Sequence, residues 1–252
     1  MTHHDYLREW QGGLANAVTS YWRARAERDE RDRFAKEDRR RRHHPAGKNG
    51  RPFAAFDGLI RDLLLASGIA DCLVYHRHAT GSTTDVHATN DRDLLAVVNG
   101  HVLLFAEFRS QVGSVAENLA DRTGEALHRA TDLWTAYREG AFKGSQRPWL
   151  GYFMMLEDAP ESTRPIRHIP EPHFTVFPEF RGTSYAQRYG LLCQRLVRER
   201  LYDAACFLMS SREGGLRGEY REPNTELSFR TFASGLVGHA MTFARLRGLG
   251  NR

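Results

Sequence analysis

The stretch Asn90–Gln111, NDRDLLAVVNGHVLLFAEFRSQ, determines how the middle of this chain is expected to fold. Its apolar residues predict two β-strands, Asp93–Val98 and Val102–Phe108, and the Asn-Gly pair between them is a strong signal for a hairpin. An apolar strand has little use for a carboxylate, yet each of these strands carries one, Asp93 and Glu107. These two acids are therefore the first candidates for a functional site.

A carboxylate on a buried strand must be neutralised, paired with a cation or bound to a metal, because an isolated buried charge is costly. Arg109 follows Glu107 by two residues, which places both on the same face of the strand. An acid on one strand, followed by acid-x-cation on the next, resembles the core of the PD-(D/E)xK nucleases. The resemblance implies that the acids hold Mg²⁺ and that the cation stabilises the charge that develops on phosphate. The alternative is a hairpin whose charged side chains face water, and this short motif alone does not decide between the two.

The length of the hairpin loop determines whether the two acids share a face of the sheet. A strict two-residue loop would place Asp93 opposite Ala106. A three-residue loop over residues 99–101, with a glycine bulge, pairs Asp93 with Glu107 instead. The nuclease interpretation therefore predicts the bulged register.

Length and composition are those of a globular protein, and the net positive charge favours a polyanionic partner. The chain has 252 residues, a net charge of +5, a pI near 9.3 and a mean hydropathy of −0.56. We expect a single nuclease domain, with a helical N-terminal arm and basic loop over residues 1–52 and a catalytic core with recognition elements over residues 53–252. Neither a signal peptide nor a membrane-spanning run is evident, and the three scattered cysteines, Cys72, Cys193 and Cys206, suggest reduced core residues. We therefore expect a cytoplasmic protein without a membrane partner.

The pattern of apolar residues predicts an α/β protein with a mixed central sheet flanked by helices. Ser114 and Glu117 form a capping-box pattern at the start of a long helix, and the loop over residues 210–224 looks exposed and basic. In order, the predicted elements are helices at about 5–37 and 53–66, a strand at 72–75, the hairpin, the helix from 114, a strand at 149–156, a helix at 184–201, a strand at 204–209 and a helix at 228–245.

Longer blocks carry a more specific resemblance than the acid motif does. These blocks are EFRSQVGSVAENLADRTGEALHRATDLWTAYREGAF, RPWLGYFMMLED, VFPEFRGTSYAQRYGLLCQRLVRERLYDAACFL and YREPNTELSFRTFASGL. They are similar to the XhoI family of type II restriction endonucleases, from about Phe56 to the C-terminus, whereas the N-terminal third resembles the family only loosely. The resemblance implies a PD-(D/E)xK restriction-endonuclease-like fold, Mg²⁺-dependent cleavage of double-stranded DNA at a CTCGAG-like palindrome, and a homodimer. It also implies a cognate DNA methyltransferase in the same system, with no stable complex between the two.

The same resemblance assigns roles to individual residues. Asp93 falls at the first metal-binding acid and Glu107 at the second, with the Phe108 carbonyl as a third oxygen ligand. Asp57 is a possible accessory acid, although such a residue more often sits at a helix N-terminus, where the helix dipole favours it. Arg109 falls at the catalytic cation, where the family has lysine.

Three functions stay open, and the arginine at position 109 is the main support for one of them, DNA binding without cleavage. Arginine is larger than lysine, planar and effectively never deprotonated, so charge stabilisation survives the exchange but a role that needs proton loss does not. The chain is therefore either a restriction enzyme, a site-specific DNA-binding protein that has lost cleavage, or a repair or structure-specific nuclease without base specificity. A scaffold role has no feature of the sequence in its favour.

DNA contacts are expected from long polar side chains, because arginine pairs with guanine, and asparagine and glutamine pair with adenine, in the major groove. For each of these residues, phosphate contact or plain surface is the competing interpretation. The candidates are Arg41, Lys48, Asn49, Gln111, Asn118, Arg122, Arg181, Ser184, Arg188, Arg217 and Arg221.

Overall fold

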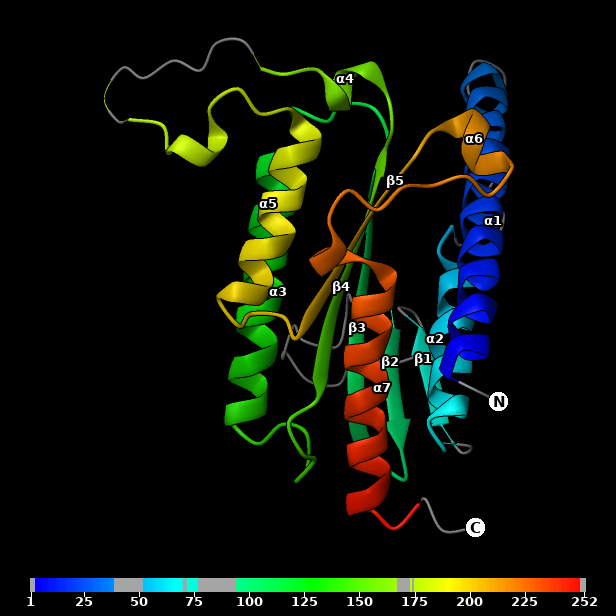
Figure 1. Cartoon of the computed structure of the whole chain (residues 1–252), viewed down its shortest axis with the longest axis vertical. Helices are drawn as coiled ribbons and strands as arrows, with labels where there is room; N and C mark the ends of the chain where they lie inside the picture. The colour runs from blue at the N-terminus through cyan, green and yellow to red at the C-terminus, as the bar shows by residue number, and fades with distance from the viewer. Residues whose placement is uncertain are drawn as a thin grey trace. The chain divides into compact units, whose positions relative to one another are not determined.

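The computed structural model describes residues 3–38, 52–69, 72–76, 94–166, 173 and 175–249, shown in colour in Figure 1. The chain divides into two compact units. The first comprises residues 1–62 and 210–220, and the second comprises residues 63–209 and 221–252. The expectation of a single nuclease domain stays a prediction.

The first unit is built on the long helix α1, His3–Asp38. Its apolar stripe is buried at Leu14, Val18 and Trp22. The Trp22 indole donates a hydrogen bond of 3.0 Å to the Ser210 hydroxyl. Because these apolar side chains repeat at helical spacing, one face of α1 packs while the charged face stays in water.

The segment after Ser210 differs from its prediction as an exposed basic loop. It contains the short helix α6, Arg212–Leu216, in which Gly214 and Gly215 are buried. A Cβ atom at residue 215 would lie within 2.1 Å of the Trp22 ring, so only glycine allows this close approach. Gly215, which the sequence placed in a loop, therefore allows α6 to pack closely on α1.

A five-stranded sheet forms the centre of the second unit, with strand order β1-β2-β3-β4-β5. The strands β1, β2 and β3 are antiparallel neighbours, whereas β3 and β4 are parallel. The mixed central sheet predicted from the sequence is confirmed. The strands are β1 (Cys72–His76), β2 (Leu94–Val98), β3 (His101–Gln111), β4 (Trp149–Glu157) and β5 (Ala204–Ser210).

Helices cover both faces of this sheet (Figure 1). On one face, α3 (Leu119–Arg138) and α5 (Tyr185–Arg198) bury their apolar stripes in one core cluster with β3, β4 and β5. On the other face, Phe232 of α7 (Phe229–Leu246) packs edge-on against Trp149 at 5.0 Å between ring centroids. Shorter elements complete the unit, namely α4 (Pro160–Thr163), η1 (Pro178–Phe180) and η2 (Thr225–Leu227), while α2 (Ala54–Ala66) runs across the boundary between the two units.

The central hairpin reaches the predicted register by a different route. Its turn has two residues, Asn99 and Gly100, both with positive φ, and Val98 pairs directly with His101. The prediction of a three-residue loop is therefore wrong. The extra residue lies further along, where Ala96 pairs with Leu104 although Val97 pairs with Val102, so β3 bulges at residue 103.

The bulge sets the register at the end of the hairpin that carries Glu107. Beyond it Leu94 pairs with Ala106, which is the register predicted for the pairing of Asp93 with Glu107. Without the bulge Leu94 would face Phe105, because pairing partners then slip by one residue. Asp93 itself lies outside the described residues.

Two smaller predictions from the sequence have different outcomes. The helix predicted to begin at a Ser114 capping box begins at Leu119, and Ser114 has a positive φ of 44° and caps no helix. The two cysteines with described side chains, Cys193 and Cys206, are free and buried as predicted, and burial raises the pKa of both thiols.

In the part of the chain described here, no helix has both the length and the apolar character needed to cross a membrane.

Candidate active site

Glu107 and Arg109 lie on the face of β3 that packs against α3 and α5. Glu107 pairs in register with Tyr152 of β4, and Arg109 pairs with Met154, whose side chain belongs to the buried core. Glu107 is 0% exposed and Arg109 is 8% exposed. A sheet centre normally excludes charges, so a fully buried carboxylate beside a nearly buried guanidinium is the strongest indication of function within the described residues.

An alternating chain of acids and arginines runs from the strand to helix α3. The Arg109 guanidinium lies 3.4 Å from the Glu107 carboxylate and 3.6 Å from the Glu125 carboxylate of α3. Glu125 also accepts a 2.8 Å hydrogen bond from Arg122, one turn earlier on the same helix. These opposite charges offset part of the cost of burying Glu107.

The backbone of β3 adds an oxygen to this cluster. Nη1 of Arg109 donates a 2.7 Å hydrogen bond to the Phe108 carbonyl. The Glu107 carboxylate and the Phe108 carbonyl, both implied as metal ligands by the family resemblance, therefore lie beside the same cation. No group of three or more His, Cys, Asp and Glu side chains that could hold a metal occurs among the described residues, to which Asp93 does not belong.

Two further polar side chains adjoin the cluster on the sheet. The Tyr152 hydroxyl is buried without a hydrogen-bond partner among the described residues, and burial is the main cause that raises the pKa of this phenol far above its usual value. Gln111 uses its amide nitrogen to donate a 2.6 Å hydrogen bond to the Gly113 carbonyl. Gln111 thus fixes the turn after the strand, and the DNA contact proposed for it stays a prediction.

Several predicted site residues cannot be placed beside this cluster. Asp93, Arg41, Lys48 and Asn49 lie outside the described residues. Asp57 belongs to the first turn of α2 and is buried, which agrees with the alternative that the sequence left open for it. Its proposed role as an accessory acid stays a prediction.

The remaining candidates for DNA contact make intramolecular contacts. Asn118 donates to the Ser114 carbonyl, Arg122 pairs with Glu125, and Arg181 donates to the Val176 carbonyl. The Ser184 hydroxyl caps α5, and Arg188 donates to the Thr183 hydroxyl.

Two arginines of the late basic segment form ion pairs. Arg217 contacts Glu213 and Glu219, and these acids raise the pKa of its guanidinium. Arg221 pairs with Asp158. The prediction of a basic exposed loop therefore overstates the positive charge available there, because neighbouring carboxylates offset it.

The contact between Glu125 and Arg109 was not predicted from the sequence. Nothing in the sequence assigned a role to Glu125. Arg122 and Arg129 flank it on the same helical face, and a carboxylate between two arginines is an ordinary exposed pattern. Only the packing of α3 on β3 shows that this carboxylate reaches Arg109.

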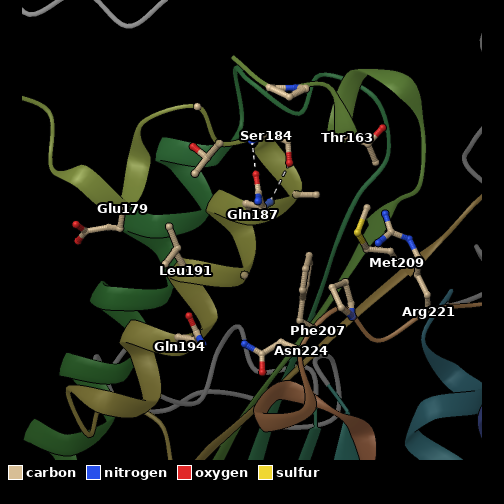
Figure 2. A pocket seen from close by; sticks show the side chains of 16 residues that line it. Thr163, Glu179, Ser184, Gln187, Leu191, Gln194, Phe207, Met209, Arg221 and Asn224 are labelled. Atoms are coloured by element: carbon tan, nitrogen blue, oxygen red, sulfur yellow. Dashed lines mark hydrogen bonds between the residues drawn. The ribbon is translucent and has the colours of Figure 1, made fainter. Parts of the chain in front are cut away.

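A cleft of about 610 Å³ opens beside α5 (Figure 2). Gln187 and Gln194 of α5 line one wall, and Phe207 and Met209 of β5 lie opposite, with Asn224 beside Phe207. Amide side chains are donors and acceptors that fit the edges of nucleobases. Two residues of this cleft, Ser184 and Arg221, were predicted from the sequence as DNA contacts, but none of its amides was.

Comparisons with known proteins agree with the resemblance noted from the sequence. The model of the family "Restriction endonuclease XhoI" matches residues 31–222. The chain is 42% identical to the type II restriction enzyme BstVI of Geobacillus stearothermophilus over 203 residues, covering 78% of this chain and 90% of the relative. It is 35% identical to the type II restriction enzyme AbrI of Azospirillum brasilense, covering 67% of this chain and 75% of the relative.

A third relative is the type II restriction enzyme XhoI of Xanthomonas vasicola, which is 32% identical and covers 71% of this chain and 72% of the relative. No solved structure matches the chain. The family match begins earlier than the resemblance seen from the sequence, within α1, and ends before α7. On the extent and identity of these matches, the chain belongs to the XhoI restriction endonuclease family.

Proposed function

We propose that the protein is a type II restriction endonuclease that cleaves double-stranded DNA at a CTCGAG-like palindrome by Mg²⁺-dependent phosphodiester hydrolysis. The observation that carries the proposal is the fully buried Glu107 beside Arg109 on a central strand, in a chain of this family. A protein kept only for its fold has no use for a carboxylate at that position, because an apolar side chain there costs nothing to bury.

The oxygen atoms on β3 fit a divalent metal ion. The Glu107 carboxylate and the Phe108 carbonyl both lie beside one cation, the Arg109 guanidinium, which shows that a positive charge is accommodated there. Oxygen ligands favour Mg²⁺, whereas zinc sites normally include nitrogen or sulfur. We propose that Glu107, the Phe108 carbonyl and Asp93 hold the metal ion.

Each side chain then has a separate task. Glu107 and the Phe108 carbonyl bind the metal ion from one strand, and Arg109 supplies positive charge for the phosphate. When bound, Mg²⁺ lowers the pKa of a coordinated water and stabilises the negative charge that develops on the phosphate. Glu125 and Tyr152 lie around Arg109 and Glu107, and the buried core beside them keeps bulk water away from the cluster.

DNA contact requires polar side chains that can turn from their present partners to the duplex. We propose Asn118 and Arg181, which are bonded to nearby backbone carbonyls, together with the amides of the cleft beside α5. A palindromic target has two-fold symmetry, so we also propose that the protein acts as a homodimer.

The experiment that tests this function sequences the ends that the purified chain produces from a mixture of plasmids in Mg²⁺. Ends that all derive from one palindrome support it, and ends at CTCGAG support the specific site. Ends at unrelated sequences would indicate a nuclease without base specificity. Intact DNA in Mg²⁺ contradicts the proposal.

The second candidate function is site-specific binding without cleavage, and the ion pairs of Arg109 favour it. A guanidinium held by Glu107, Glu125 and the Phe108 carbonyl is less available to the phosphate than a mobile lysine ammonium. Such a protein would occupy its site in Mg²⁺ and leave the DNA intact.

We expect Arg109→Lys to increase the rate of cleavage, by about tenfold or more, because a compact ammonium approaches both the water and the phosphate. The measurement is the single-turnover rate on one synthetic duplex for both chains. Arg138→Lys is the matched control, since it makes the same exchange at an exposed position in the last turn of α3. A lower rate for Arg109→Lys would mean that the planar guanidinium is required.

A further inference from the structure

We propose that Glu125 is a positioning residue that draws the Arg109 guanidinium away from the metal ligands when a divalent cation binds. The inference rests on the proposed function, in which Glu107 and the Phe108 carbonyl are metal ligands. It adds a task for a carboxylate of α3 that neither the sequence motif nor the family resemblance assigns.

The distances show that Arg109 is shared between two carboxylates. Charge-assisted hydrogen bonds between a guanidinium and a carboxylate are usually about 2.7–2.9 Å long. The separations of 3.4 Å to Glu107 and 3.6 Å to Glu125 both exceed that range. The guanidinium is therefore not closed onto either acid, and a small movement brings it into full contact with Glu125.

A metal ion and the guanidinium compete for the same oxygens. Nη1 of Arg109 donates to the Phe108 carbonyl at 2.7 Å, and Nη2 faces the Glu107 carboxylate. A metal ion at these oxygens would repel the guanidinium, because like charges interact strongly where water is scarce. Metal binding would thus favour a position of Arg109 further from these oxygens, next to another anionic partner.

Glu125 meets the requirements for that partner. Its carboxylate already lies beside Nε of Arg109 and is anchored by the 2.8 Å bond from Arg122. The Glu125 side chain is 41% exposed, whereas that of Glu107 is 0% exposed. Glu125 can therefore hold the guanidinium at the rim of the cluster, where its charge remains available to a phosphate.

The test is a double-mutant cycle on metal affinity, measured by calorimetric titration of the full chain with Mn²⁺ in the absence of DNA. The chains are wild type, Glu125→Gln, Arg109→Gln and the double variant. Asp121→Asn, an exposed acid one turn earlier on α3, is the matched control for loss of one negative charge. Circular dichroism confirms that each chain is folded.

We expect Glu125→Gln to weaken Mn²⁺ binding about fivefold, because Arg109 then remains over Glu107. Arg109→Gln should tighten Mn²⁺ binding about tenfold. Adding Glu125→Gln to the Arg109→Gln chain should change the affinity by less than about twofold, because no guanidinium is left to displace. Asp121→Asn should leave the affinity unchanged.

Two results would overturn the inference, and they are distinguishable. If Glu125→Gln weakens binding equally with and without Arg109, Glu125 is itself a metal ligand or acts only through its charge, while the metal site stands. If Arg109→Gln binds no Mn²⁺, the metal site on Glu107 and the Phe108 carbonyl is wrong, and the proposed function loses its basis as well.

Discussion

Replacing Glu107 by glutamine is expected to reduce the rate of DNA cleavage by about 10³-fold or more. The exchange removes the negative charge that binds the metal ion but keeps the shape of the side chain, so the sheet around it can remain packed. Arg109 keeps contacts with Glu125 and the Phe108 carbonyl in this variant. The measurement is the single-turnover rate on a synthetic duplex that carries one CTCGAG site.

Binding of the same duplex in EDTA separates a chemical defect from a folding defect. We expect Glu107→Gln to bind DNA as tightly as wild type, because Glu107 is buried and does not reach the surface. Glu161→Gln, an exposed acid of α4, is the matched control and should cleave at the wild-type rate. Retained cleavage by Glu107→Gln would show that the chemistry occurs elsewhere.

The largest effect on stability is expected from Phe232→Ala, which should lower the free energy of unfolding by about 3–5 kcal/mol. Phe232 is 0% exposed, and its ring packs against Trp149, Phe153 and Phe229 on the α7 face of the sheet. Removing the ring leaves a cavity that this rigid sheet face cannot close. Chemical denaturation of both chains measures the difference.

Phe177→Ala is the matched control for that substitution. The Phe177 side chain is 64% exposed, so its removal should change the free energy of unfolding by less than about 0.5 kcal/mol. Equal effects of the two substitutions would contradict the arrangement in which α7 covers the sheet.

The hairpin shows how far local sequence determines this fold. Runs of apolar residues and the Asn-Gly pair correctly predict two paired strands, because turn chemistry and strand propensity are local properties. The bulge at residue 103 is not visible in the sequence, since Val102, Leu103 and Leu104 are all acceptable strand residues. The predicted register of the hairpin came from assuming that Asp93 and Glu107 act together, which is a functional argument.

At the start of α3, a local signal in the sequence predicted the wrong structure. Ser114 and Glu117 have the spacing of a capping box, yet the helix begins at Leu119 and Ser114 adopts a positive φ. The chain must first turn away from the end of β3, and Gln111 stabilises this turn through its bond to the Gly113 carbonyl. Tertiary constraints at a strand end override a local capping signal.

Some residues of the candidate site could be identified from the sequence, and others only from the fold. Glu107 and Arg109 were identifiable because charges are unexpected on an apolar strand. Glu125 was not, because an acid on the polar face of a helix is unremarkable until the helix is placed against the strand. The arginines proposed for DNA contact could not be ranked from the sequence, since the carboxylates that pair with Arg217 and Arg221 are recognised only in the fold.

The most direct test of the central claim uses two plasmids that differ only in one CTCGAG site, incubated with the purified chain in Mg²⁺ or in EDTA. We predict that only the plasmid with the site is converted to a linear molecule, and only in Mg²⁺. Cleavage of both plasmids would contradict the proposed specificity. If both stay intact in Mg²⁺ while the protein still occupies the site, the chain binds DNA without cleaving it, and the proposed catalytic role of Glu107 and Arg109 is wrong.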